Sequence, residues 1–182
     1  WVFRGVSAEF ESDHIYGLIG FNGSGKSTLL QMISGFITPN EGEIKWTISH
    51  ENLKVEQWSK HLTMATPYLD LFEEFTVLES IELHLKFKSL AKPPKEILEE
   101  IELAKHKDKM LSQLSSGMRQ RLKLALAIYS ESPLLLLDEP CANLDKKWSE
   151  WYNDVLCKHK HNRLIIICSN SQEIEMRQID SH

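Results

Sequence analysis

The sequence predicts an α/β protein with a mostly parallel sheet, and three observations lead to this prediction. Continuous apolar runs of strand length, residues 134–138 (LLLLD) and 163–168 (RLIIIC), indicate strands that are buried on both faces. Segments with helical periodicity lie between such runs, as the crossovers of a parallel sheet require. A glycine-rich loop at residues 20–27 follows a strand and precedes a helix, which is the arrangement of a P-loop NTPase.

The first strand and the first helix flank the glycine-rich loop. Residues 15–19 (IYGLI) are a short apolar run that predicts a strand. The helix after the loop is expected to end at Gly35, and its apolar side chains recur at helical spacing, namely Leu29, Leu30 and Ile33. Residues 42–49 (GEIKWTIS) alternate apolar with polar side chains after a turn, which predicts a half-buried strand of a small antiparallel part.

An inserted α-helical subdomain is expected at about residues 76–130. Thr76 and Glu79 have the spacing of a capping box, which marks a helix start. A second helix follows a proline pair and carries apolar side chains on one side, namely Ile97, Leu98, Ile101 and Ala104. Residues 116–130 predict a third, amphipathic helix. A stripe of large side chains indicates one more helix before the last strand, formed by Trp148, Trp151, Tyr152 and Val155.

Length and composition fit one soluble domain over residues 1–182. The chain begins with Trp1 rather than Met, so the natural N-terminus and a first strand are expected to be missing. The net charge of −5 and the lack of a dense Lys/Arg block give no indication of nucleic-acid binding. The apolar runs are too short to span a bilayer, so any membrane role requires a partner. Three widely spaced cysteines predict buried, reduced thiols in the cytosol, namely Cys141, Cys157 and Cys168.

The glycine-rich loop (GFNGSGKS) matches the phosphate-binding pattern GxxxxGK followed by Ser or Thr. Its glycines let successive backbone N–H groups point at phosphate oxygens, and the following helix adds its positive end. Lys26 is expected to reach the β- and γ-phosphates, and the Ser27 hydroxyl to ligate Mg²⁺. The residues predicted to bind ATP are Gly20, Asn22, Gly23, Ser24, Gly25, Lys26, Ser27 and Thr28. Kinases, GTPases, helicases and transporter ATPases share this loop, so the reaction stays open.

Two carboxylates end the buried strand at 134–138. Parallel sheets place their ligands at the carboxyl ends of the strands, so Asp138 and Glu139 are expected near the phosphate loop. Asp138 is predicted to hold Mg²⁺, and Glu139 to orient or deprotonate an attacking water. Glu139 therefore favours hydrolysis over transfer of a phosphoryl group to a small-molecule hydroxyl.

A short polar stretch, LSSG at residues 114–117, opens the amphipathic helix. Ser115 could merely cap this helix, or the free N–H groups and hydroxyls of its first turn could bind an anion. With this stretch the sequence resembles the nucleotide-binding domain of ABC transporters over essentially its whole length. The motifs are GFNGSGKST, LSSGM in place of the signature LSGGQ, LLLLDEP, and NLD at 143–145.

The resemblance implies an ATPase that binds Mg²⁺-ATP and drives a separate transmembrane permease from the inner face of the cell membrane. Two such chains form a head-to-tail dimer, homodimeric or with a related chain, that sandwiches two ATP molecules. Ser115 and Gly117 would contact the γ-phosphate bound to the other chain. Catalytic roles would fall to Lys26 and Glu139.

The chain departs from the family pattern at four positions. Ser116 and Met118 replace Gly and Gln within the signature, and both keep the helix start. Pro67 stands where the family carries a Gln that senses Mg²⁺ and the membrane partner. Asn170 stands at the switch His and could still hydrogen-bond a γ-phosphate, so it is the third expected catalytic residue. The aromatic ring that stacks on adenine has two candidates, Trp1 and Phe3.

Two rival functions stay open at this point. One is a degenerate cassette that uses ATP as a dimerisation switch with little turnover, which Pro67 and Asn170 favour and Glu139 opposes. The other is a soluble ABC ATPase outside transport, which would require a second cassette, a coiled-coil insertion or a basic face. The expected activity is slow, Mg²⁺-dependent ATP hydrolysis.

Overall fold

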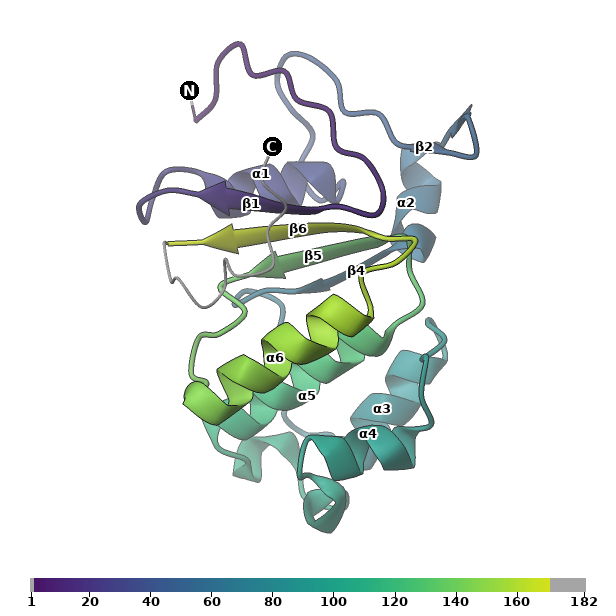
Figure 1. The fold of residues 1–182 in the computed structure, drawn as a ribbon, viewed down its shortest axis with the longest axis vertical. Helices are drawn as coiled ribbons and strands as arrows, with labels where there is room; N and C mark the ends of the chain where they lie inside the picture. Colours follow the sequence, from purple (N-terminus) through teal and green to yellow (C-terminus); the bar gives the residue numbers. More distant parts are fainter. Residues whose placement is uncertain (1, 171–182) are drawn as a thin grey trace.

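A parallel sheet of four strands lies at the centre of the structure, a computed structural model that describes residues 2–170 (Figure 1). From edge to edge the strands are β1 (Ile15–Ile19), β6 (Leu164–Ser169), β5 (Leu134–Asp138) and β4 (Leu62–Ala65). Each neighbouring pair is parallel. The carboxyl ends of all four strands therefore lie at one edge, on the left in Figure 1.

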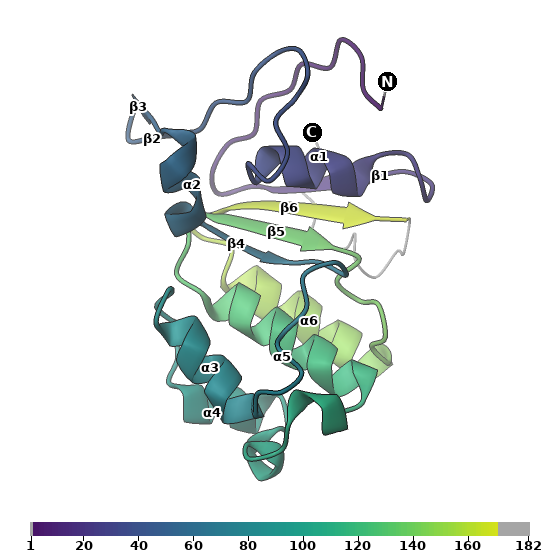
Figure 2. The same cartoon turned by 180° about the vertical axis from the view of Figure 1, so that it is seen from behind.

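Helices cover both faces of this sheet (Figures 1 and 2). One face carries α1 (Lys26–Ile33), and the other carries α5 (Ser116–Tyr129) and α6 (Lys146–Lys158). Alternate side chains of the buried strands pack against the helices on opposite faces of the sheet, because successive strand side chains point in opposite directions. In β5, Leu136 packs into the cluster under α1, whereas Leu135 and Leu137 belong to the cluster under α5 and α6.

The remaining elements lie outside these layers. An outer layer beside α5 consists of α3 (Val77–Leu85), α4 (Pro94–Glu100) and two short 3₁₀ turns, η1 (Ala104–His106) and η2 (Leu111–Gln113). A small antiparallel pair, β2 (Thr47–Ile48) and β3 (Glu51–Asn52), precedes α2 (Val55–His61). The predicted fold class is therefore confirmed. Among the helices of residues 2–170, none has both the length and the apolar character needed to cross a bilayer.

Several local predictions are confirmed. The helix after the loop stops before Gly35, whose φ of 81° breaks the helical geometry. At the start of α3, Glu79 N donates to Thr76 Oγ1 over 3.2 Å, and Thr76 N donates to Glu79 Oε2 over 2.7 Å, which completes the capping box. Ser115 caps α5, because its Oγ accepts a hydrogen bond from Met118 N over 3.2 Å.

Other predictions were wrong, and each error has a physical reason. Residues 42–49 alternate in exposure as expected, but only Thr47 and Ile48 form a strand, because within the described chain the two residues of β3 are the only strand that pairs with this segment. The helix α4 ends at Glu100 and does not include Ile101 and Ala104 as expected, since Glu102 has a φ of 56°. Cys157 is exposed, unlike the other two thiols. The elements α2 and β4 were not predicted.

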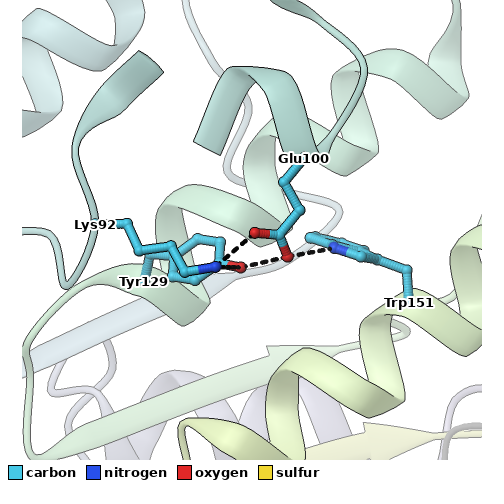
Figure 3. A network of polar contacts seen from close by, with 4 residues as sticks. All are labelled: Lys92, Glu100, Tyr129 and Trp151. Carbon is cyan, nitrogen blue, oxygen red and sulfur yellow. Dashed lines mark hydrogen bonds and ion pairs between the residues drawn. The ribbon is translucent and has the colours of Figure 1, made fainter. Parts of the chain in front are cut away.

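A half-buried polar network joins the outer helices to α5 and α6 (Figure 3). Glu100 accepts hydrogen bonds from Lys92 Nζ and Tyr129 Oη, each over 2.6 Å, and from Trp151 Nε1 over 3.0 Å. Desolvation acts to raise the pKa of Glu100, but the three hydrogen bonds and the charge of Lys92 outweigh it, so this pKa lies below its usual value. One carboxylate thereby fixes α4 against both helices of the inner layer.

The substitution Glu100→Gln is expected to lower the free energy of unfolding by about 2 kcal/mol, because it leaves the Lys92 ammonium without its counter-charge. Since the pKa of Glu100 is depressed in the folded state, its contribution is present above the unfolded pKa and is lost as pH falls through the folded value. The difference between wild type and variant in urea unfolding should therefore shrink below about pH 4. The control Glu99→Gln, at a 59% exposed side chain, should change little, and equal effects of both substitutions would contradict this role.

Candidate functional site

The phosphate loop connects the carboxyl end of β1 to α1. Gly23 and Gly25 have φ values of 82° and 98°, a left-handed conformation that side chains other than glycine rarely adopt. Gly25 is also the N-cap residue of α1, so the helix starts directly at Lys26. The N–H groups of this first helical turn have no partner within the helix, which makes the loop a suitable anion-binding site.

Lys26 lies across its own loop in this structure. Its Nζ donates hydrogen bonds to the carbonyl oxygens of Gly20 over 2.7 Å and Phe21 over 3.2 Å. The thiol of Cys168 lies beneath the loop, where Sγ donates to Lys26 O over 3.6 Å. Burial, and next the charge of Asp138, raise the pKa of this thiol well above its usual value, so Cys168 acts as neutral packing under the loop.

Asp138 and Glu139 stand at the end of β5, close to the loop. Asp138 is only 4% exposed, and within residues 2–170 no lysine, arginine or histidine forms an ion pair with it. A buried carboxylate without a counter-charge suits a bound cation. Glu139 has a φ of 48°, a strained value for this residue type, and its N–H donates to Cys168 O over 2.9 Å.

The register of the sheet brings most of the predicted site together. β6 lies between β1 and β5, with Ser169 opposite Ile19 and Cys168 opposite Asp138. Asn170 follows β6 and therefore lies between the phosphate loop and Glu139 at the same edge. The structure thus groups Asn170 and the two carboxylates with the loop residues Gly20 to Thr28.

The LSSG stretch is not part of this group within one chain. α5 lies on the sheet face opposite to α1, so Ser115 and Gly117 are separated from the phosphate loop by the sheet (Figures 1 and 2). Their neighbours are instead the residues after β5: a Cβ added to Gly117 would lie 3.0 Å from Asn143 O. A cavity of about 270 Å³ lies at this helix start, lined also by Arg121 and Trp148, whose guanidinium carbon and ring centroid are 3.9 Å apart.

A segment between β4 and α3 is fastened to α5 by ion pairs that the sequence analysis missed. Lys123 Nζ lies 2.8 Å from Asp70 Oδ1 and donates to Thr66 O over 3.2 Å, and Arg119 Nη1 lies 3.6 Å from Glu73 Oε1. The hydrogen bond from Lys123 holds the pKa of Asp70 below its usual value. A cavity of about 160 Å³ lies between this segment, α5 and Glu139. The sequence signals for these pairs were two basic residues at helical spacing, Arg119 and Lys123, and an acidic segment earlier in the chain at residues 70–74.

Phe3 is the aromatic residue that the structure places over the phosphate loop. A Cβ added to Gly25 would lie 2.8 Å from Phe3 Cζ, and it would also contact Val2. Trp1, the other candidate for stacking on adenine, lies outside the described residues. Tyr68, which sequence reasoning did not single out, follows β4; burial is the largest cause that raises the pKa of its hydroxyl.

Comparisons with a family model and with individual proteins point to the same family. The family model described as "ABC transporter" matches residues 3–142. The uncharacterized ABC transporter ATP-binding protein YybJ of Bacillus subtilis is 35% identical over 177 residues, which cover 94% of this chain and 80% of YybJ. The cytochrome c biogenesis ATP-binding export protein CcmA of Haemophilus influenzae is 27% identical over 176 residues, which cover 95% of this chain and 83% of CcmA.

The structure of this chain also resembles a solved structure of an ATP-binding cassette. A dimeric post-hydrolysis state of the ATP-binding cassette MJ0796, bound to ADP and Pi, superposes with a TM-score of 0.77 at 23% identity. The match covers 96% of this chain and 82% of that cassette. The chain therefore belongs to the ABC transporter family, and it is an ATP-binding ATPase domain of that family.

Proposed function

We propose that this chain hydrolyses ATP between two copies of the domain and thereby powers a separate transmembrane transporter. One observation supports this most: two helix starts, at Lys26 and at Ser116, have free N–H groups that suit an anion, and the sheet separates them. A nucleotide on the phosphate loop can meet an LSSG stretch only if a second chain supplies it. The dimeric state of the MJ0796 cassette is consistent with this arrangement.

Each residue of the proposed site has a distinct task. The loop N–H groups and Lys26 hold the phosphates, and Lys26 must first release the Gly20 carbonyl. Ser27 and Asp138 fit Mg²⁺, which protein sites usually hold with one or two oxygen ligands besides the phosphates. When bound, this ion neutralises charge on the phosphates. Glu139 lies at the same edge and orients the water that attacks the γ-phosphorus.

Asn170 and Glu139 together bear on whether the chain hydrolyses ATP or uses it only as a dimerisation switch. At the end of β6 its amide can donate a hydrogen bond to the γ-phosphate, but it cannot carry a positive charge as a histidine can. We therefore propose slow hydrolysis rather than none, because Glu139 remains in place. The names of YybJ and CcmA contain the words transporter and export, which favours transport over the soluble rival.

The membrane partner is proposed to bind near the segment between β4 and α3. Apolar side chains are exposed there, with Leu69 40%, Phe72 61% and Met110 48% exposed. The ring centroids of Phe72 and Phe75 lie 5.3 Å apart, and Phe75 O accepts a hydrogen bond from Leu111 N, so these residues form one surface. Clustered exposed apolar residues indicate a protein contact. The segment between β4 and α3 carries part of this surface, and its Pro67 and Asp70 line the same cavity as Glu139. The chain would then lie peripherally on the inner face of the membrane.

Phosphate release by the purified chain tests this function. If two chains complete each site, the rate per chain should rise with protein concentration and level off when dimers dominate. Removal of Mg²⁺ with EDTA should reduce release to the level of a blank, because Ser27 and Asp138 then lack the ion they hold. A rate per chain that does not depend on concentration from nanomolar upward would contradict the shared site. No release at any concentration would leave the degenerate switch as the function.

A further inference from the structure

Phe21 has the largest exposed fraction among the large apolar side chains that the structure describes, and it belongs to the phosphate loop. Its side chain is 88% exposed, and Ile19, two positions earlier at the end of β1, is 61% exposed. Exposure of this much apolar surface to water is unfavourable. Phosphate binding does not require it, because the loop holds phosphates with N–H groups and Lys26. The exposed ring therefore suits a contact with a second protein surface.

The backbone that carries the Phe21 ring is held in a turn. Its carbonyl oxygen accepts hydrogen bonds from Ser24 N over 3.1 Å and from Lys26 Nζ over 3.2 Å. A side chain presented from such a fixed turn loses little backbone freedom when it binds. Because Lys26 is expected to reach the phosphates, a surface that covers the phosphates also comes close to Phe21.

The cavity of about 270 Å³ at the LSSG helix start has the composition of a protein interface. Its lining includes Met118, Arg121 and Trp148. Aromatic, Met and Arg side chains are the types enriched in the cores of interfaces. The indole of Trp148 covers one face of the Arg121 guanidinium, with 3.9 Å between the guanidinium carbon and the ring centroid. A guanidinium plane has a second face on which another aromatic ring can stack.

The size of this cavity fits the ring of a phenylalanine. A cavity of about 150 Å³ is enough to bind benzene. The LSSG cavity is larger, so a phenyl ring can enter it and still leave space beside the helix start for a phosphate. Phe21 cannot fill the cavity of its own chain, because the sheet separates the phosphate loop from the start of α5 (Figures 1 and 2).

We infer that Phe21 is an anchor of the ATP-bound dimer, and that its ring enters the LSSG cavity of the second chain against Met118 and the stack of Arg121 on Trp148. This inference rests on the proposed function, because that function brings the phosphate loop of one chain to the LSSG stretch of the other. Two-fold symmetry repeats the contact at the second site. The nucleotide then joins the chains through its phosphates, and Phe21 adds an apolar contact that involves no nucleotide atom.

The test measures the Kd of the dimer by sedimentation equilibrium, with Mg²⁺-ATP and the Glu139→Gln chain as parent. Adding Phe21→Ala should raise this Kd by roughly 30-fold or more, the usual effect of truncating an interface residue that contributes strongly to binding. The matched control is Phe36→Ala, which removes a 63% exposed ring beyond the end of α1 that lies away from the loop. This control should dimerise like the parent. Affinity of the monomers for a fluorescent ATP analogue is measured alongside, because the loss should appear in dimerisation.

A second variant tests where the ring binds. Met118→Ala shortens a side chain that lines the cavity and leaves the helix start in place. If the ring of Phe21 packs on Met118 of the second chain, the two substitutions remove the same contact. The rise in dimer Kd for the double variant should then be smaller than the product of the two single rises.

Three results would overturn the inference. One is a parent-like dimer Kd for Phe21→Ala, and another is a pair of losses that simply multiply in the double variant. The third is an equal loss of monomer affinity for the ATP analogue, which would show that Phe21 acts on its own loop. Each of these, with a parent that dimerises, leaves the proposed function intact. A parent that forms no dimer with Mg²⁺-ATP contradicts both the proposed function and the anchor.

Discussion

Substitution of Lys26 by alanine is expected to reduce ATP hydrolysis roughly 10²- to 10³-fold, the usual loss when a group that stabilises transition-state charge is removed. Lys26 is the charged residue of the phosphate loop itself, and its Nζ already lies over that loop, 2.7 Å from Gly20 O. Nucleotide affinity should fall as well, because the ammonium interacts with both ground-state and transition-state phosphates. Phosphate release and binding of a fluorescent ATP analogue measure the two effects.

The control for this variant is Lys45→Ala. Lys45 is 61% exposed and pairs with Glu43 on the surface, so its removal should leave hydrolysis unchanged. If Lys26→Ala retained activity similar to Lys45→Ala, the phosphate loop would not be the site of hydrolysis. Far-UV circular dichroism of both variants verifies that neither loss results from unfolding.

Substitution of Glu139 by glutamine is expected to have the second large effect. Loss of a general base or water-orienting carboxylate typically costs 10²- to 10⁴-fold in rate, and turnover should fall by roughly this amount. Glutamine retains the size of the side chain, so ATP should still bind and should now persist in the site. The variant with Mg²⁺-ATP should therefore elute from a sizing column as a stable dimer, whereas wild type should return to monomers as ATP is consumed.

The control Glu150→Gln changes an exposed carboxylate of α6 that pairs with Lys146 over 3.9 Å, and it should behave as wild type. A Glu139→Gln chain that remains monomeric at saturating Mg²⁺-ATP contradicts the sandwich arrangement for this chain. Turnover at the wild-type rate would instead show that another group activates the water.

Local features of the sequence were sufficient to predict β1, β5 and β6, the phosphate loop and the starts of α3 and α5. The apolar runs of β5 and β6 indicate strands that are buried on both faces. The caps of α3 and α5 each join two residues that are three positions apart. These are short-range patterns, so one sequence reveals them. The strand predicted at 42–49 was mostly wrong because a strand requires a partner, and alternation alone does not supply one.

The parts of the site that escaped prediction all depend on contacts between residues distant in sequence. The pairs Asp70–Lys123 and Glu73–Arg119 join segments that only the fold brings together. The sequence revealed that Pro67 breaks the family pattern, but not that Pro67 lines a cavity together with Lys123 and Glu139. The separation of Ser115 from the phosphate loop by the sheet likewise became visible only in the fold.

Complementation between two inactive variants tests most directly whether each ATP site is shared by two chains. Lys26→Ala disables the phosphate loop, and Gly117→Asp places a negative charge at the LSSG helix start, where a carboxylate is compatible with the helix dipole but repels a phosphate. Each variant alone should be inactive. In an equal mixture, mixed dimers retain one site with an intact loop and an intact LSSG stretch, so roughly a quarter of the wild-type rate should return. If the mixture stays as inactive as its components, the two motifs do not act across a dimer, and the central claim is wrong.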